Sequence, residues 1–520
     1  MKPAFHWLKS SPYHPILFGI FPVLALYANN AGEVGPDVLP RPLLVSLGLA
    51  AATLLAVRLL VRGWQRAALL ASLLLVLFFS YGQVYDLKRT ILPLADLMRH
   101  RFLAPFFLMV LIVGVVLILR MRETIHLTAV FNLVGAALLI MSLGQLGLQA
   151  LTSSRENRQA SEVRLPVRPL NASPGQPLPS VYFILLDGYM RSDALLRDMQ
   201  YDNSKFVQEL ENLGFYVPSC SRANYFYTQG TMTTALNMDD LGVLQAEIEQ
   251  SGLQMDIFAL IKHSKVRQQL EALGYKTVAF DSGYEWSRIR DADIYLGLNR
   301  DTYAMQSLNP FEAMLLKSTL LRIYTDETIK RSQAGLSQVN SPFNEHIELE
   351  RFILARLPDL AKDPAPKFVF AHILIPHWPY IFLPDGSVRD DPNFDQYNPT
   401  DEQIRQGYVD SVAFVSSRIT TVVKQILADS ETPPIIVIFG DHGLEKENRL
   451  QNFTAIYLTG SNGDLYDTIT PVNFFRVIFN RVFNAGYEIL PDFSYLDIDP
   501  GEGVNIQPVT ETAPECLDGR

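Results

Sequence analysis

Five long apolar stretches in the first 150 residues limit what this chain can fold into more than any other feature. They cover residues 14–29, 41–61, 65–84, 102–120 and 126–148. Each is about long enough to cross a hydrocarbon core of about 30 Å as a helix, and a cleaved signal peptide accounts for one such stretch but not for five. The pattern predicts a transmembrane region of five helices, since helices pair their backbone groups inside a bilayer.

Basic residues flank these stretches unevenly. They gather before the first stretch, between the second and third, and between the fourth and fifth: Lys2, Lys9, Arg58, Arg62, Arg66, Arg120 and Arg122. Such loops face the cytoplasm, although the basic loop at residues 86–101 makes the bias modest. Five spans with the N-terminus inside would place the rest of the chain outside. We therefore expect a bacterial inner (cytoplasmic) membrane protein with its soluble domain on the periplasmic or extracellular side.

Charge separates the membrane region from the remainder. Residues 1–150 carry 12 Lys and Arg against 5 Asp and Glu, whereas the whole chain carries 44 against 54. The remainder is therefore acidic, which argues against nucleic acid as a partner. The two cysteines, Cys220 and Cys516, are too few for a disulfide framework or a Cys-rich zinc site. Their spacing leaves open whether they pair.

The chain beyond the membrane region divides into three predicted parts. Residues 151–179 are rich in Ser, Pro, Arg and Asn and are interpreted as an extended linker. Residues 180–497 form the catalytic domain and 498–520 a C-terminal tail. Nearly continuous apolar runs, typical of strands buried on both faces, occur at residues 181–187, 276–281, 367–374, 433–441 and 453–458. Helical periodicity between them indicates an α/β domain, a mainly parallel sheet covered by helices on both faces.

Ionisable residues lie at or just beyond the ends of three of these strands. Asp187 ends the first, His372 and His377 accompany the third, and Asp441 and His442 end the fourth, followed by a glycine that lets the backbone turn. In open α/β sheets functional groups gather at the carboxyl ends of the strands. Two carboxylates with imidazoles suit Zn²⁺ or Mn²⁺. An Asp at a strand end is often only structural, but several together favour a metal site.

A threonine-rich segment supplies a candidate nucleophile. In "SRANYFYTQGTMTTALNMDD" (221–240) the apolar pattern indicates a helix that begins near Thr228. A threonine hydroxyl needs a metal or a base to become a good nucleophile, and a helix N-terminus favours an anionic phosphoryl group. Thr231 is the rival nucleophile, and a helix cap followed by a Thr-rich face is the structural alternative.

Five segments resemble one family. "LLDGYMRSD", "NYFYTQGTMTTALNM", "FAHILIPHWPYIFLPDG", "FGDHG" and "ITPVNFFRVIFN" follow the order seen in sulfatase-like members of the alkaline phosphatase superfamily, over roughly residues 180–495. With five preceding spans, the layout is similar to that of membrane-bound phosphoethanolamine transferases and lipoteichoic acid synthases. These enzymes pass a phospholipid headgroup through a phospho-threonine to an acceptor in the cell envelope.

The resemblance implies a role for each site residue. Asp187, Thr228, Asp441 and His442 match the metal ligands, with Thr228 also the nucleophile. His372 and His377 match a pair that contacts the phosphoryl oxygens, assists proton transfer or holds a second ion. The formylglycine motif of true sulfatases is missing, since "CSRAN" does not supply it.

The predicted function is therefore a metal-dependent transferase that moves a phosphoryl-linked headgroup from a phospholipid donor to an envelope glycan or lipid acceptor. A phosphate or sulfate ester hydrolase with the same metal core is one alternative. A non-catalytic envelope scaffold is the other, and the intact set of site residues argues against it.

Overall fold

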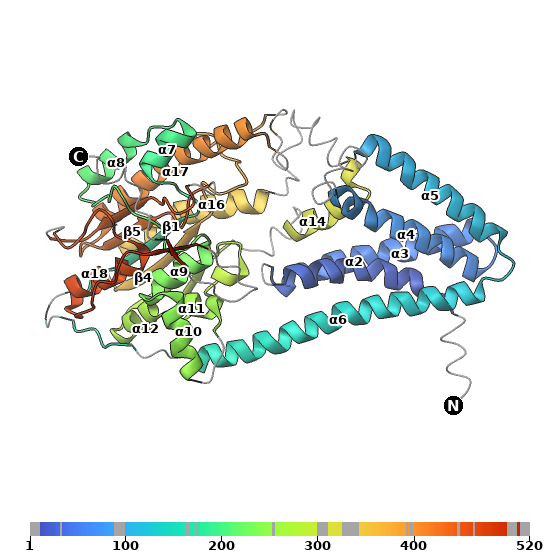
Figure 1. Ribbon diagram of the computed structural model, residues 1–520, viewed down its shortest axis with the longest axis horizontal. Coiled ribbons are helices and arrows are strands. Elements are labelled where there is room, and N and C mark those ends of the chain that lie inside the picture. Colours follow the sequence, from blue (N-terminus) through green and yellow to red (C-terminus); the bar gives the residue numbers. More distant parts are fainter. Residues whose placement is uncertain are drawn as a thin grey trace. The chain divides into compact units, whose positions relative to one another are not determined.

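The structure is a computed structural model with two compact units. It describes residues 11–31, 34–87, 99–162, 167–172, 175, 177–251, 255–298, 310–324, 343–391, 394, 399–444, 448–460, 463–496 and 507–509. The first unit consists of Met1–Ser153 and Asp301–Asn344, and the second of Ser154–Arg300 and Glu345–Arg520. Figure 1 shows the helices of the first unit and the sheet of the second.

Five helices form the N-terminal part of the first unit, one for each apolar stretch. They are α2 (His14–Asn30), α3 (Pro40–Leu60), α4 (Trp64–Asp86), α5 (His100–Arg120) and α6 (Ile125–Glu162). Among the described residues, four are long and apolar enough to cross a membrane, and the 17-residue α2 is shorter than these. The chain is therefore a membrane protein with a separate soluble domain.

The border of the membrane unit differs from the prediction in two places. Helix α6 continues to Glu162, so the predicted linker begins as a helix. Residues 151–162 contain neither Pro nor Gly, the residues that most oppose a helix. In addition, α14 (Pro310–Ser318) packs against α2 and α4, so part of the predicted catalytic domain belongs to the membrane unit.

A six-stranded sheet forms the centre of the second unit. Its strands are β1 (Val181–Leu186), β2 (Lys276–Phe280), β3 (Ile294–Leu296), β4 (Lys367–Ile373), β5 (Ile435–Phe439) and β6 (Thr454–Tyr457). They lie in the order β3-β2-β4-β1-β5-β6, and only β6 is antiparallel to its neighbour. The predicted α/β class is confirmed, and β4, β1 and β5 end side by side at one edge of the sheet.

Helices cover both faces of this sheet (Figure 1). One face carries α9 (Thr228–Asn237), α10 (Leu241–Gln250), α11 (Ile257–Lys262), α12 (Lys265–Ala272) and α18 (Pro471–Phe483). The other carries α7 (Ser192–Met199), α8 (Ser204–Asn212) and α17 (Asp401–Asp429). The main core lies between the first face and α9 and α18, where Phe183 of β1 packs against Phe475.

The remaining elements are short or peripheral. They are η1 (Pro36–Val38), η4 (Glu285–Ser287), α16 (Asn344–Arg356), η5 (Pro358–Lys362) and the two-stranded sheet of β7 (Ser494–Leu496) and β8 (Gln507–Val509). Cys220 is disulfide-bonded, and Cys516 lies outside the described residues. Most of the predicted tail, 498–520, lies outside them too.

Candidate metal centre

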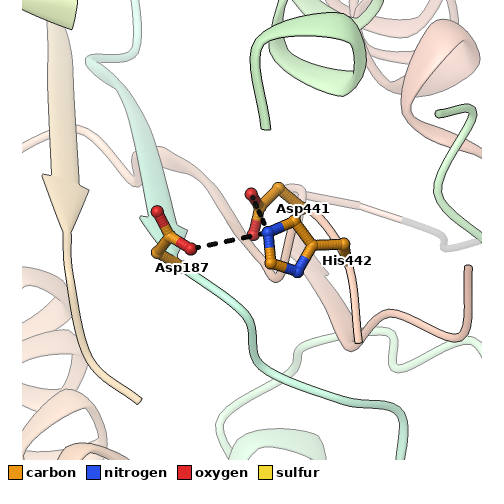
Figure 2. A group of neighbouring side chains, drawn as sticks. All are labelled: Asp187, Asp441 and His442. Atoms are coloured by element: carbon orange, nitrogen blue, oxygen red, sulfur yellow. Dashed lines mark ion pairs between the residues drawn. The ribbon is translucent and has the colours of Figure 1, made fainter. Parts of the chain in front are cut away.

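Asp187, Asp441 and His442 meet at the carboxyl edge of the sheet. Asp187 directly follows β1, and the other two follow β5, the neighbouring strand. Figure 2 shows the three side chains turned toward one another. His442 Nε2 lies 3.7 Å from Asp187 Oδ1 and 3.3 Å from Asp441 Oδ2, and one ligand atom from each residue lies within 4.8 Å of the others. The parallel register of β1 and β5 thus brings residues more than 250 positions apart into one cluster.

Two carboxylate oxygens in this cluster have no hydrogen-bond partner among the described residues. Asp187 Oδ1 and Asp441 Oδ2 are both buried and unpaired, and the two residues are 4% and 0% exposed. A buried, unpaired carboxylate oxygen is costly unless a cation or donor satisfies it. The two oxygens therefore fit a divalent cation.

His442 presents the nitrogen that a metal needs. Its Nδ1 lies 2.8 Å from the carbonyl oxygen of Gly443, and because a carbonyl only accepts, Nδ1 carries the proton. Nε2 then faces the two carboxylates with its lone pair. Burial lowers the pKa of His442, although Asp441 and Asp187 oppose this shift, and the neutral ring is the form that binds metals.

Two glycines shape the turns beside these ligands. Gly188 has φ +74°, which favours glycine, and its N–H donates to Asp441 Oδ1 at 2.8 Å. The glycine after the Asp-His pair, Gly443, is needed for space, because a Cβ there would lie 2.2 Å from the Asn448 carbonyl oxygen. Its φ does not lie in the left-handed region, so close approach replaces the expected free turn as the reason for this glycine.

His372 holds Asp187 and does not face an open site. It is fully buried, its Nε2 lies 3.0 Å from Asp187 Oδ2, and its Nδ1 lies 3.2 Å from Ser287 Oγ. The ring packs 5.4 Å from the Trp286 ring. Because both nitrogens are engaged, this geometry argues against the expected contact with a phosphoryl group and favours an orienting role.

His377 is the more open member of the histidine pair. Its Nδ1 donates to the Trp378 carbonyl oxygen at 2.7 Å, and its Nε2 has no partner among the described residues. The ring lies 6.5 Å from the His442 ring, and the neighbouring Trp378 is 40% exposed. His377 therefore lies beside the cluster with one nitrogen available.

Asp187 is the most strongly perturbed acid of the cluster. Burial alone would raise the pKa of its carboxyl, but the electrostatic effect of His377, the hydrogen bond from His372 and the weaker effects of His372 and His442 outweigh burial and lower the pKa. Asp187 therefore stays ionised, as a cation ligand must.

Thr228 and Thr231 have different surroundings. Thr228 is the first residue of α9, is 8% exposed, and its hydroxyl makes no hydrogen bond with the described residues. Thr231 is fully buried, and its hydroxyl donates to the Tyr225 carbonyl oxygen at 3.0 Å. Tyr227, which caps α9, gives no side-chain hydrogen bond to the first turn. The free hydroxyl at an uncapped helix start favours Thr228 as the reactive threonine.

Arg449 connects the approach to α9 with the metal ligands. Its Nε donates to the Phe226 carbonyl oxygen at 2.9 Å, and its Nη2 donates to His442 Nε2 at 3.1 Å. The guanidinium would have to leave Nε2 when a cation binds there, and its charge would then lie beside an incoming anion. Arg449 follows the Asp-His pair by a few residues but was not singled out from the sequence.

Two further ionisable residues that the sequence-based prediction did not include, Glu350 and His346, lie on α16. Glu350 is fully buried, and its Oε1 accepts from the Leu374 N–H at 3.1 Å, while its Oε2 has no partner in the part of the chain that the structure describes. Burial raises the pKa of Glu350 to about 8; the Leu374 hydrogen bond opposes the shift and Asp187 adds to it. His346, one helical turn earlier, has its pKa lowered to about 4 by burial and by His377. The His-x3-Glu spacing on a helix was the available signal.

The donor set as a whole suits a divalent ion. Asp187, Asp441 and His442 offer two carboxylate oxygens and one imidazole nitrogen, a combination that zinc and manganese accept. Catalytic zinc sites commonly have three protein ligands and an open position.

Comparison with known proteins gives one family match and several structural likenesses. The sulfatase family model matches residues 229–483, which include Asp441 and His442 and begin one residue after Thr228. No curated protein matches the chain in sequence.

Three solved structures illustrate the likenesses. The C-terminal periplasmic domain of EcEptC from Escherichia coli, in complex with Zn, is 12% identical, with TM-score 0.42, and covers 66% of this chain and 96% of that one. The integral membrane protein lipooligosaccharide phosphoethanolamine transferase A from Neisseria meningitidis is also 12% identical, with TM-score 0.39, covering 92% and 94%. The phosphonate monoester hydrolase of Agrobacterium radiobacter is 11% identical, with TM-score 0.36, covering 62% and 82%.

The family match confirms the predicted class of enzyme, and the described helices confirm its attachment to a membrane. Residues 229–483 of this chain are sulfatase-like, and the chain also carries helices long and apolar enough to span a membrane.

Proposed function

We propose that this enzyme moves a phosphoryl-linked headgroup from a phospholipid to an acceptor alcohol in the cell envelope, through a phospho-threonine at Thr228. The observation that carries the proposal is the pair of unpaired, buried carboxylate oxygens of Asp187 and Asp441 beside His442. Arg449 connects this cluster to the segment that begins α9 at Thr228.

Asp187, Asp441 and His442 would hold the Zn²⁺ or Mn²⁺ ion, with Thr228 as a fourth ligand. When bound, such an ion makes a nearby hydroxyl more acidic and neutralises charge on phosphoryl oxygens.

The transfer needs two displacements at phosphorus. In the first, Thr228 Oγ1 loses its proton and bonds to phosphorus, while the bond from phosphorus to the lipid's glycerol oxygen breaks and that oxygen takes up a proton. In the second, the acceptor alcohol loses its proton and bonds to phosphorus, while the bond from phosphorus to Thr228 Oγ1 breaks and Oγ1 takes up a proton. The uncapped start of α9 and the Arg449 guanidinium would stabilise the negative phosphoryl group.

The two histidines take different parts in this scheme. His377 has an available Nε2 beside the cluster, so it is the candidate to contact the phosphoryl oxygens or move the proton. His372 keeps Asp187 in position through its Nε2.

The membrane unit and Cys220 support a proposal for the location. A lipid headgroup is within reach of an enzyme fixed to the bilayer, and Cys220 is disulfide-bonded, as in oxidising compartments outside the cytoplasm. We therefore place the soluble domain on the periplasmic or extracellular side of the bacterial inner membrane. The bonded Cys220 is also unavailable as a formylglycine precursor, which favours Thr228 over sulfatase chemistry.

The domain limits are also part of the proposal. We retain residues 1–150 as the membrane domain, 180–497 as the catalytic domain and 498–520 as the tail, except that residues 310–324 move from the catalytic to the membrane domain.

The test is to trap the intermediate in the full-length enzyme reconstituted in vesicles with headgroup-labelled phospholipid. Thr228→Val should abolish labelling of the protein and lower turnover by at least about a thousandfold, as removal of a nucleophile does, while Thr228→Ser should retain label. Label that survives Thr228→Val and disappears with Thr231→Val would assign the rival threonine.

The acceptor separates transfer from hydrolysis. Transfer requires the release of label from the protein to depend on an added acceptor. Release of the water-soluble headgroup at the same rate without any acceptor would identify a hydrolase. Absence of both labelling and turnover in the wild-type enzyme would favour the non-catalytic scaffold.

A further inference from the structure

A segment from the second half of the chain is fastened to the membrane helices. This 310–324 segment comprises α14 and the residues that follow it. Two ion pairs connect it to α3 and α4: Arg41 with Glu312, and Arg322 with Asp86, the latter at 2.7 Å. The side chains of Glu312 and Arg322 are only 8% and 5% exposed. Removing one partner of such a pair leaves an unpaired buried charge, so these contacts fix the segment.

Backbone contacts bring the same segment directly against α4. The N–H of Leu320 donates to the Phe78 carbonyl oxygen at 2.7 Å. At Gly82 a Cβ would lie 1.9 Å from the Lys317 carbonyl oxygen, so only glycine permits this approach. Phe311, which is fully buried, packs in one cluster with residues of α2. The segment is therefore an integral part of the membrane unit.

An apolar groove lies where this segment meets the spans. Its volume is about 490 Å³, within the usual range for ligand pockets. It is lined by residues of α3, α4 and α5, among them Phe78 and Ala104, and by Leu320 and Ile323 of the segment. Among the described residues, Thr53 is the only polar one in the lining. A water molecule needs several polar partners, and this lining does not supply them.

The groove opens onto the surface that faces hydrocarbon. Three of its lining leucines, Leu49, Leu108 and Leu320, are 37%, 56% and 40% exposed. The first two belong to helices with the length and hydropathy of membrane spans. In a bilayer, lipid tails therefore surround this surface.

We propose that this groove is a lipid site that holds one acyl chain of a membrane phospholipid. Hydrophobic transfer does not drive such binding, since a lipid tail is as apolar as leucine. A void would deprive the lining side chains of van der Waals partners, and a hydrocarbon chain restores these contacts. The fixed 310–324 segment distinguishes the groove from the ordinary lipid-facing surface, because it gives the chain a rigid second wall.

The proposal is independent of the chemistry at Thr228. The lipid site lies in the membrane unit, and the experiment measures bound phospholipid, not turnover. Thr228→Val should therefore retain the lipid even though it loses activity, and loss of the phospho-threonine hypothesis would leave this site untouched.

The test uses adjacent leucines as a matched pair. Leu320 lines the groove, whereas Leu321, equally exposed at 42%, does not. Full-length protein carrying Leu320→Trp or Leu321→Trp is purified in mild detergent, exchanged against a phospholipid of defined acyl length, and analysed by native mass spectrometry. Leu320→Trp should weaken retention of phospholipid by about tenfold, which corresponds to about 1.4 kcal/mol, and Leu321→Trp should match wild type.

A second pair of variants, on α5, controls for the possibility that Leu320→Trp acts by misfolding the 310–324 segment. Ala104→Phe fills the groove from the opposite wall, and Val113→Phe adds a similar ring outside it, at a position that is 51% exposed. Ala104→Phe should lose lipid and Val113→Phe should retain it. Equal retention in all four variants would overturn the proposal, as would a dimer that holds no lipid and dissociates with Leu320→Trp, because a second copy would then occupy the groove.

Discussion

The carboxyl ends of β5 and β4 lie on either side of β1, yet they present their ionisable groups differently. Beyond β5, Asp441 Oδ2 has no hydrogen-bond partner among the described residues, and His442 Nε2 faces Asp187 while accepting only from the Arg449 guanidinium, which a bound cation would displace. On β4, His372 has a partner at each ring nitrogen. Position at the end of a strand is therefore not enough to make a residue a metal ligand. What matters is whether its acceptor atoms are left free after the fold has satisfied its own hydrogen bonds.

The largest effect should come from the β5 end. Asp441→Asn preserves shape and the acceptor for the Gly188 N–H but removes the negative charge. We expect metal affinity to fall by more than about a hundredfold, beyond the 10- to 100-fold typical of residues that only hold a ligand, and turnover to fall with it. Metal content after dialysis, measured beside activity, checks this. Full activity of the variant with no metal bound would contradict the proposed mechanism with a single metal ion.

The β4 end should give an intermediate effect. His372→Phe leaves Asp187 Oδ2 without its donor but keeps all four proposed ligands. Metal affinity should fall by about 10- to 100-fold, and saturating metal should restore most of the turnover. Titration of the variant with zinc and manganese measures both. If added metal restores nothing, His372 is as essential as Asp441 and the contrast between the two strand ends disappears.

His377 tests whether the open histidine acts on the substrate. Its proposed partner is the phosphoryl group, so His377→Ala should lower turnover by about tenfold or more with little loss of bound metal. The neighbouring change Trp378→Phe is the control, since the Trp378 carbonyl that accepts from His377 is retained. Parallel losses of metal and turnover would make His377 a ligand, and an unchanged rate would leave only packing.

The sequence predicted the sheet well because its strands are buried on both faces and therefore nearly continuous in apolar residues. All five predicted strands correspond to observed ones, and α9 begins at Thr228 as predicted. The three-residue β3 was missed because so short a run has no readable pattern. The association of the 310–324 segment with the membrane helices was also missed, because it depends on ion pairs between residues more than 200 positions apart.

The site was predictable to a similar degree. The converging Asp187, Asp441 and His442 could be read from strand ends, because parallel strands share one edge. The hydrogen bonds that each side chain makes could not be predicted from strand ends. For this reason His372 was expected to face the substrate. Arg449 and Glu350 were missed because their relevance depends on tertiary contacts with His442 and Leu374.

The smallest effect concerns Glu350, which supports the backbone just after β4. Burial raises the pKa of Glu350 to about 8 from its ordinary value of 4.5, so between these values the folded state binds a proton that the unfolded state has lost. Its contribution to stability is therefore complete below about pH 4.5 and disappears as the pH rises through about 8. Between pH 5.5 and 8 this amounts to a few kcal/mol at most, at about 1.4 kcal/mol per pH unit.

Glu350→Gln should remove this dependence. Glutamine cannot ionise and keeps the acceptor for the Leu374 N–H, so the variant should gain stability relative to wild type as the pH rises from 5.5 to 8. The melting temperature of the full-length protein at both pH values checks this. Glu348→Gln, on the same helix but with a side chain 39% exposed, is the control and should show no such trend. A difference between Glu350→Gln and wild type that stays constant with pH would mean that Glu350 is ionised in the fold, and that its free oxygen, like those of Asp187 and Asp441, awaits a cationic partner.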